Sequence, residues 1–379
     1  MRALHFGRFH SDTFGGLERH VDALIRSMAG RVGSDNLVAS ENLSGGTLDL
    51  GYCRVIKAPS LGLVASASLC PTMPAIARRL HRARPYDIVH LHFPDPMSHL
   101  VWECLPRGPR LVISWHSDVI RQKRLMRLYS PFLDRIVNRA DAIVAATPAH
   151  FGASEQLGAV RDRAKLKVVP YGMDYAPYAP SPALETRAAS IRERTPGRHR
   201  IFAVGRHVYY KGFAHLIEAM TRVPDAVLVL GGSGPLLEEH RALAARLGLG
   251  ERVVFPGRIP DAELPAYYAA CDVFCMPSTH PSEAFGLVQL EAMASARPIV
   301  CCRLGNGVNF VHQDGVNGLA VPPGDAGALA DALNALLADP VLRRRMGDAG
   351  RARALSEYNT ERMASGMIAV YRSLLGERT

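Results

Sequence analysis

The chain has 379 residues, of which 48% are hydrophobic and 21% charged, and its formal net charge is +10. This length predicts two domains, and the composition is that of a globular protein rather than a disordered or fibrous one. No apolar run reaches the roughly 18 residues that a membrane span needs, and residues 1–7 lack a signal-peptide core. We therefore expect a cytoplasmic protein.

Short apolar runs that are typical of strands alternate with helical patterns through the first half of the chain. The predicted strands are residues 3–6, 37–40, 54–57, 88–92, 111–115, 142–145 and 167–169. Helical patterns lie between them, for example at residues 17–28 and 131–139. This alternation predicts parallel β-α units.

The alternation stops at a proline-rich and then charged stretch, which predicts a linker at residues 175–198. It then starts again. Strands are predicted at residues 201–204, 226–230, 253–255, 273–275, 299–301 and 318–321, and helices at 213–221, 326–337, 341–356 and 360–374. The predicted fold class is therefore α/β, with two doubly wound Rossmann-like domains at residues 1–174 and 199–359 that face a central cleft.

Two carboxylates, Glu283 and Glu291, flank a glycine and an apolar run that predicts a buried helix. The backbone N–H groups of Phe285, Gly286 and Leu287 lie between them, at the expected positive end of that helix. Nucleotide-sugars carry hexose hydroxyls, a diphosphate and ribose hydroxyls in the same order, and carboxylates and helix starts bind such groups. The alternative is one Glu favoured by the helix dipole and a second that is only solvated.

Further loops after predicted strands carry glycines or cations. Gly15 and Gly16 precede the first helix and permit close approach of a phosphate, with a tight turn as the alternative. Arg206 and Lys211 bracket the loop after residues 201–204 and could neutralise a diphosphate, with plain surface cations as the alternative. Neither the dinucleotide fingerprint nor a P-loop sequence is present, which argues against a dehydrogenase and a P-loop NTPase.

Histidines cluster in the first half. His90 and His92 share one face of a predicted strand, and His116 follows the next strand. Imidazoles bind zinc, but no carboxylate or cysteine lies at a convincing ligand spacing, so no metal is expected. The rings are expected to line the cleft as neutral hydrogen-bonding groups or to pack against the sheet.

The positive charge is also concentrated in the first half. Residues 1–170 carry 23 Lys and Arg against 14 Asp and Glu, whereas the rest of the chain is nearly balanced. In residues 121–127, four cations flank apolar residues at helical spacing, which is typical of a helix that lies on an anionic membrane surface. A solvated basic face is the alternative. No nucleic-acid-binding motif accompanies the charge, so nucleic acid is not an expected partner.

Together these features resemble the retaining GT-B glycosyltransferases of family 4 over nearly the whole chain. The resemblance rests on the order and spacing of Gly15-Gly16, Tyr171-Gly-Met-Asp174, Gly205-Arg206 with Lys211-Gly212, the glycine-rich residues 231–235, and the pair Glu283 and Glu291. Residues 115–123 are similar to those of bacterial members that add mannose or a related hexose to lipopolysaccharide or exopolysaccharide.

The resemblance implies a role for each matching catalytic residue. Arg206 and Lys211 would hold the donor diphosphate, and Glu283 would bind the hexose hydroxyls. Glu291 would bind the ribose. His116 would contact the transferred sugar near the reacting carbon.

The resemblance also implies a donor site, a metal-free mechanism and a set of partners. The implied donor-binding residues are Gly15, Gly16, Gly205, Gly234, Phe285, Gly286, Leu287 and Glu291. No metal or other cofactor is expected, because the two cations take its place, and helix 360–374 is expected to cross back onto the first domain. The expected partners are a nucleotide-diphosphate sugar (GDP-mannose as the first choice), a glycan or polyprenyl-diphosphate-linked acceptor, and the anionic inner face of the plasma membrane.

The implied function is therefore retaining hexose transfer in cell-surface polysaccharide synthesis. The competing hypothesis is a non-catalytic nucleotide-sugar-binding partner of a polysaccharide assembly complex. That hypothesis predicts the loss of Lys211 or Glu283, and both are present.

Overall fold

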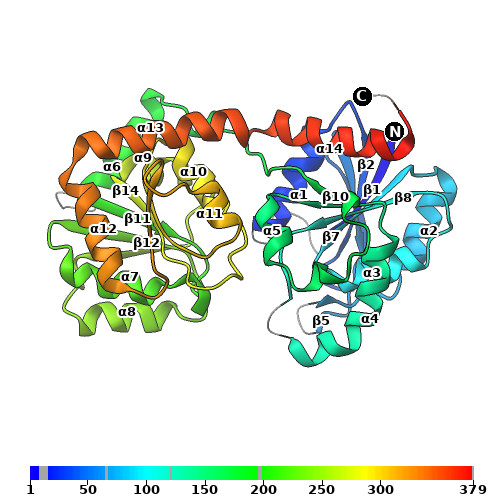
Figure 1. Ribbon diagram of the computed structural model, residues 1–379, viewed down its shortest axis with the longest axis horizontal. Helices are drawn as coiled ribbons and strands as arrows, with labels where there is room; N and C mark the ends of the chain where they lie inside the picture. Colours follow the sequence, from blue (N-terminus) through cyan, green and yellow to red (C-terminus); the bar gives the residue numbers. More distant parts are fainter. Residues whose placement is uncertain (8–15, 65–66, 120–121, 195–198, 378–379) are drawn as a thin grey trace. The chain divides into compact units, whose positions relative to one another are not determined.

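The computed structural model describes residues 1–7, 16–64, 67–119, 122–194 and 199–377. The chain divides into two compact units, which we treat separately (Figure 1). Unit 1 comprises Met1–Met173 and Asn359–Thr379, and unit 2 comprises Asp174–Tyr358. Each unit holds a sheet covered by helices, so the α/β fold class predicted from the sequence is confirmed.

Unit 1 is built on an eight-stranded sheet in the order β10-β9-β8-β7-β1-β2-β4-β3. Neighbouring strands pair in parallel, except that β3 runs antiparallel to β4 at one edge. The strands are β1 (Arg2–Gly7), β2 (Gly33–Ala39), β3 (Gly46–Asp49), β4 (Cys53–Ala58), β7 (Ile88–Phe93), β8 (Arg110–Trp115), β9 (Ala142–Ala145) and β10 (Leu166–Val168), with a separate two-stranded ribbon of β5 (Leu63–Val64) and β6 (Ala67–Ser68). The sequence predicts the parallel strands but not β3, β5 or β6, which are short and mostly exposed and so carry little apolar pattern.

The helices of unit 1 cover both faces of this sheet (Figure 1). They are α1 (Gly16–Ser27), α2 (Met73–Ala83), α3 (Pro96–Glu103), α4 (Lys123–Arg139), α5 (Pro148–Ala153) and α14 (Thr360–Leu375), with single 3-10 turns η1 (Gln156–Ala159) and η2 (Arg163–Lys165). Side chains from α1 and α14 share one apolar cluster with Ala3 and Ile88, whereas α2, α3 and α4 pack on the other face, against Leu4 and Val89. Because side chains alternate along a strand, His5, His90 and His92 belong to the face with Ala3 and Ile88.

Unit 2 is built on a six-stranded, all-parallel sheet in the order β13-β12-β11-β14-β15-β16. Its strands are β11 (His199–Val204), β12 (Ala226–Gly231), β13 (Val253–Gly257), β14 (Val273–Met276), β15 (Ile299–Cys302) and β16 (Gly318–Val321). Its helices are α6 (Pro182–Arg194), α7 (Phe213–Ala219), α8 (Leu237–Arg246), α9 (Leu264–Ala270), α10 (Val288–Ala294), α11 (Gly307–Val311), α12 (Ala326–Ala338) and α13 (Pro340–Glu357), and its 3-10 turns are η3 (Ala176–Tyr178), η4 (Tyr209–Lys211) and η5 (Met220–Arg222). In Figure 1, α7, α8 and α12 lie on one side of the sheet, and α6, α9 and α10 lie on the other.

Residues 175–198, which the sequence predicts as a linker, contain a helix that packs on unit 2. Within their described part, α6 packs on α9 and buries Leu184, Ala188 and Ile191, so that it belongs to unit 2. These residues form an apolar stripe at helical spacing that the many charged neighbours conceal in the sequence. The chain returns to unit 1 at Asn359, and α14 packs against α1 there.

The sequence predicts the basic stretch at residues 121–127 separately from a helix at residues 131–139. Most of both segments lies in one helix, α4, which continues through Pro131. No helix in the described part of the chain is both long and apolar enough to cross a bilayer.

Candidate functional site

The predicted donor residues of unit 2 lie in loops that follow parallel strands, at one edge of the sheet. Backbone hydrogen bonds join these loops: His207 N donates to Ser233 O at 2.9 Å, and Thr279 N donates to Tyr210 O at 2.8 Å. The Asn306 side chain donates to the backbone oxygen of Glu283 at 2.8 Å. The carboxyl ends of parallel strands meet at one edge, which is where ligands bind in doubly wound sheets.

Lys211 and Glu283 form an ion pair at this edge. Lys211 Nζ lies 2.5 Å from Glu283 Oε2, and the two side chains are only 13% and 11% exposed. Ser278 Oγ donates to the same carboxylate oxygen at 3.0 Å. Burial alone would lower the pKa of Lys211, but the charge and hydrogen bond of Glu283 outweigh it, so this pKa lies above its usual value. The ammonium group is therefore charged at neutral pH.

The segment between the two carboxylates makes a sharp turn before α10. Gly286 has φ +71°, which strongly favours glycine, and a Cβ atom there would lie 2.7 Å from Met276 Sδ, so the methionine side chain would have to shift. Phe285 is buried, and its backbone oxygen accepts from Gln289 Nε2 at 2.8 Å. Leu287 caps α10, and neither its N–H nor that of Gly286 donates to another described residue. These two amides are therefore free to bind a ligand.

Glu291 lies inside α10, as predicted, and it is buried, which argues against the alternative of a solvated carboxylate. Tyr268 on α9 donates its hydroxyl hydrogen bond to Glu291 Oε2 at 2.6 Å. Burial, together with the charge of Glu291, raises the pKa of Tyr268 well above its usual value. The tyrosine is thus a permanent donor that fixes the orientation of the carboxylate.

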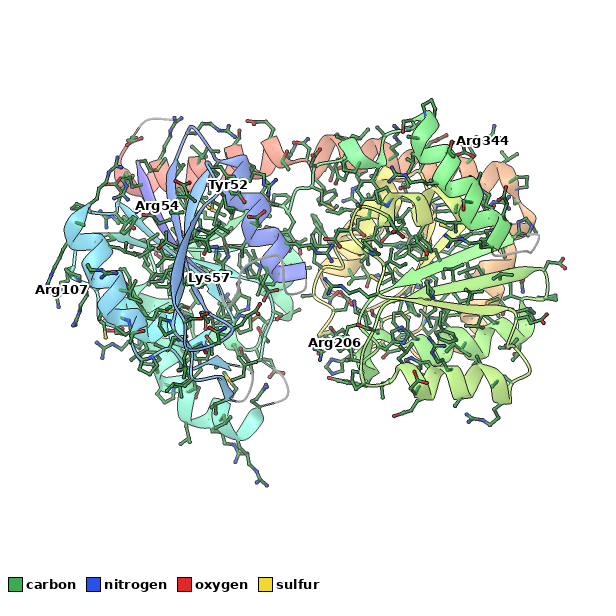
Figure 2. All side chains as sticks on the ribbon, turned by 180° about the vertical axis from the view of Figure 1, so that it is seen from behind. Tyr52, Arg54, Lys57, Arg107, Arg206 and Arg344 are labelled. Carbon is green, nitrogen blue, oxygen red and sulfur yellow. The ribbon has the colours of Figure 1, made fainter. Side chains whose placement is uncertain are left out.

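Arg206 is the exposed cation of this edge. It follows β11, and Figure 2 shows its side chain at the periphery of unit 2. Gly205 lies beneath the Lys211 side chain, since a Cβ on Gly205 would be 3.4 Å from Lys211 Cε. A Cβ on Gly234 would be 2.6 Å from the backbone oxygen of His207, so the loops after β11 and β12 can pack together only with glycine there.

The predicted residues of unit 1 lie at the start of α1 and the end of β8. Gly16 is the first residue of α1, whereas Gly15 lies outside the described residues. The ring of His20, one turn further along α1, approaches that of His116 to 5.3 Å. His116 is 9% exposed, and burial holds its pKa well below the usual value, so the ring is neutral.

The nitrogens of His116 take part in a buried chain of hydrogen bonds. Nδ1 pairs with the Tyr171 hydroxyl, and Nε2 pairs with His92 Nδ1 at 3.1 Å. His92 Nε2 in turn lies 3.4 Å from His5 Nδ1. His90 uses both nitrogens as well, with Tyr371 and with Ser114 Oγ. The histidines therefore pack against the sheet beneath α1 and α14, which is one of the two arrangements expected from the sequence.

The structure brings one set of histidine nitrogens to a spacing at which metals bind. Ligand atoms of His5, His90 and His92 lie within 4.8 Å of one another, and all three side chains are buried. A bound cation would have to replace the hydrogen bonds of His90 and the contact between His5 and His92. The described group contains no carboxylate to offset a divalent charge, so the arrangement suits a network of neutral rings better than a metal.

Three supporting residues, Tyr268, Ser278 and Asn306, are not predicted from the sequence. Each contacts a predicted carboxylate residue but lies at least five positions from it in the chain. Asn306 alone carries a local signal, since its side chain caps α11 by accepting from Val308 N. Its second contact, with Glu283, depends on the fold.

Comparisons with known proteins agree with this architecture. Residues 14–176 match the family model described as Glycosyltransferase Family 4, and residues 188–353 match that of Glycosyl transferases group 1. Among solved structures, sucrose-phosphate synthase from Thermosynechococcus elongatus is similar, with a TM-score of 0.85 over 99% of each chain. At 24% identity this likeness concerns the fold alone.

Two relatives match nearly end to end. The O-antigen chain mannosyltransferase C of Escherichia coli is 32% identical over 100% of both chains. A GDP-mannose-dependent alpha-(1-6)-phosphatidylinositol monomannoside mannosyltransferase of Mycolicibacterium smegmatis is 32% identical over 90% of each. Because the chain has two doubly wound units and is similar to these enzymes over nearly its whole length, it is an enzyme that belongs to family 4 of the GT-B glycosyltransferases.

Proposed function

We propose that this glycosyltransferase moves mannose or a related hexose, with retention of configuration, from a nucleotide-diphosphate sugar to a glycan or lipid-linked acceptor in cell-surface polysaccharide synthesis. The observation that carries the proposal is the Lys211–Glu283 pair at the carboxyl edge of the unit 2 sheet. A cation for phosphate and a carboxylate for hydroxyls stand side by side there, next to the free amides of Gly286 and Leu287.

Each residue at this edge has a defined part in the reaction. Breaking the anomeric bond builds positive charge on the sugar and negative charge on the diphosphate. Lys211 and Arg206 stabilise the diphosphate, and Glu283 binds the hexose hydroxyls. Glu291, oriented by Tyr268, binds the ribose. Because Glu283 is already bound to Lys211 and Ser278, it is poorly placed as a nucleophile, which favours front-face substitution over a covalent intermediate.

The buried residues of unit 1 would shape the other part of the reaction. His116 is neutral and held by Tyr171 and His92, so it offers a fixed ring rather than a mobile acid or base to the transferred sugar. Gly15 and Gly16 would approach the diphosphate. The two cations would take the place of a metal, so that none is required.

We assign the donor as GDP-mannose, with the names of the two mannosyltransferase relatives as support. The test is a panel of nucleotide-sugars scanned for thermal stabilisation of the protein. A ligand at 100 times its dissociation constant adds about 2.7 kcal/mol to the free energy of unfolding. Stabilisation by GDP-mannose but not by UDP sugars, and its loss in Lys211→Ala, is the expected result. Stabilisation by UDP sugars alone would refute the donor assignment.

The retaining mechanism is tested on the product. The anomeric configuration of the transferred sugar, read by NMR coupling constants, should equal that of the donor. An inverted product would refute front-face substitution. Binding of the donor without any transfer to glycan or lipid-linked acceptors would instead favour the alternative, a non-catalytic partner in polysaccharide assembly.

The acceptor side of the proposal is a membrane surface. On α4, Leu125 and Leu128 are 51% and 82% exposed, and Arg124 and Arg127 beside them are exposed as well. Apolar and basic side chains at this spacing suit the boundary of an anionic bilayer, where each cation contributes about 1 kcal/mol. Unit 1 would then meet a lipid-linked acceptor at the inner face of the plasma membrane.

Sedimentation with anionic vesicles tests this surface. The wild type should pellet at low salt and be released as salt rises, since salt screens the attraction. Arg124→Gln/Arg127→Gln should not pellet, whereas the control Arg344→Gln/Arg345→Gln, which removes two exposed charges from unit 2, should pellet normally. Equal pelleting of all three proteins would mean that α4 is only a solvated face.

A further inference from the structure

Unit 2 contains a cavity that the donor site does not use. It has a volume of about 470 Å³ and is lined by residues from α9, from the carboxyl ends of α10 and α13, and from the segment around η3 and the start of α6. In Figure 1 these helices lie together at the top of unit 2. A second cavity of about 240 Å³ shares Tyr178, Ala294 and Arg351 with it. The larger volume falls within the range of small-molecule sites.

Two cations that line this cavity lack a side-chain partner among the described residues. Arg297 and Arg351 line it, and neither guanidinium makes a side-chain hydrogen bond or ion pair with any described residue. The Nε of Arg297 and the Oγ of Ser295 are both buried without a hydrogen bond. Buried polar groups are rarely left unsatisfied, because each costs about 1–3 kcal/mol. These two atoms are enclosed by protein, so the terminal guanidinium nitrogens of Arg297 and Arg351 are the cationic groups that can contact a ligand in the cavity.

The only other charge among the lining residues is already neutralised. Glu185 forms an ion pair of 2.7 Å with Arg192, which lies outside the cavity lining. The hydrogen bond from Arg192 lowers the pKa of Glu185, and the charge of Arg297 adds to that shift. The cavity thus keeps two uncompensated positive charges, which favour a dianion.

The backbone around Arg297 is held in an uncommon conformation. Ala296 has φ 54°, and its N–H and that of Arg297 donate to Met293 O and Ala292 O, each at 2.9 Å. This pattern ends α10 in a Schellman motif, in which glycine usually takes the left-handed position. Alanine there costs about 1 kcal/mol. The motif sets Arg297 in a fixed place at the end of α10, next to Ser295.

The remaining wall is apolar. Pro180, Pro182, Ala269 and Ala294 line the cavity together with the ring of Tyr178. Proline and alanine form a rigid wall of small side chains, which accommodates a ring or a short alkyl group rather than a second charge. The polar groups and this wall belong to the same hollow, so one ligand can contact both.

We propose that this cavity binds a small organic phosphate, with the phosphate held by Arg297 and Arg351 and its organic part against the proline and alanine wall. Guanidinium groups bind phosphate oxygens through charged, often bidentate, hydrogen bonds. The site does not depend on the function proposed for the donor loops, because it shares no residue with them.

Isothermal titration of the full chain with phenyl phosphate tests the site. Phenyl phosphate should bind the wild type, and phenol, which lacks the charge, should not. Arg297→Gln/Arg351→Gln should weaken binding by about 10- to 100-fold, the loss expected for charged hydrogen bonds. Lys211→Ala, which alters the donor loops, should leave this binding unchanged. Arg344→Gln is the matched control, since Arg344 lies on the same helix as Arg351 but is exposed and does not line the cavity.

Two outcomes would overturn the proposal. One is the absence of binding to the wild type. The other is binding that Lys211→Ala abolishes and Arg297→Gln/Arg351→Gln retains, because the phosphate would then occupy the donor loops. If the double variant does not fold, the single variants Arg297→Gln and Arg351→Gln replace it, and unchanged binding to both would be equally contrary to the proposal.

Discussion

Replacing Lys211 by alanine separates the two tasks that the structure gives this residue. The side chain is 13% exposed and contacts Glu283, so its removal leaves a carboxylate that is 11% exposed without its cation. Breaking a buried ion pair from one side costs about 3–5 kcal/mol, and the partial exposure here places the loss at the lower end. The same change removes a fixed positive charge from the departing diphosphate. That loss is expected to cost about 3–4 kcal/mol of transition-state stabilisation, or a 10²- to 10³-fold lower kcat.

A second substitution distinguishes stability from catalysis. Glu283→Gln removes the uncompensated charge, so Lys211→Ala/Glu283→Gln should recover much of the free energy of unfolding but none of the turnover. Turnover is measured with saturating donor well below the melting temperature, and stability is measured by urea unfolding. Lys167→Ala, at an exposed position of unit 1, is the control and should match the wild type in both. Recovery of turnover together with stability, or more than half of wild-type turnover in Lys211→Ala, would refute the role assigned to the charge.

Three further results are expected. Unit 1 should lose stability below pH 6.5, because burial lowers the pKa of His5 and of His20 to about 3: both stay neutral in the fold, while the unfolded chain takes up protons. At pH 5 the two histidines together lower the free energy of unfolding by about 4 kcal/mol. Urea unfolding followed by tryptophan fluorescence, which reports unit 1, should show this loss. Equal stability at pH 7.5 and at pH 5 would contradict this account. Gly286→Ala should lower the melting temperature more than Gly30→Ala. Both glycines have a positive φ, but only at Gly286 would a Cβ atom lie 2.7 Å from Met276 Sδ. Equal decreases in melting temperature would mean that the Met276 side chain moves away without cost. Turnover should be unchanged in the presence of EDTA. If EDTA abolished turnover and Mn²⁺ or Mg²⁺ restored it, the reaction would require a metal.

The strands and the main helices of this protein could be predicted from the sequence, because their signals are local. Residues 142–145 and 318–321 match β9 and β16 residue for residue, since each is a short apolar run that follows a polar residue and has a proline within three residues of its end. The positions of Glu283 before α10 and Glu291 within it follow from the same kind of pattern. Elements with few apolar residues, such as β3, or with a stripe hidden among charges, such as α6, could not be recognised in this way.

Only the tertiary structure determines which of these residues meet. Lys211 and Glu283 are 72 residues apart, and they pair because β11 and β14 are neighbours in the sheet although two strands intervene between them in the chain. His90 meets Tyr371 across 281 residues because the last helix returns to unit 1. Glu291 is held by Tyr268, and the cavity around Arg297 assembles from four helices, with no motif in the sequence for either. Local sequence determines the direction in which each side chain leaves its element, whereas strand order and helix packing are non-local and determine what it contacts.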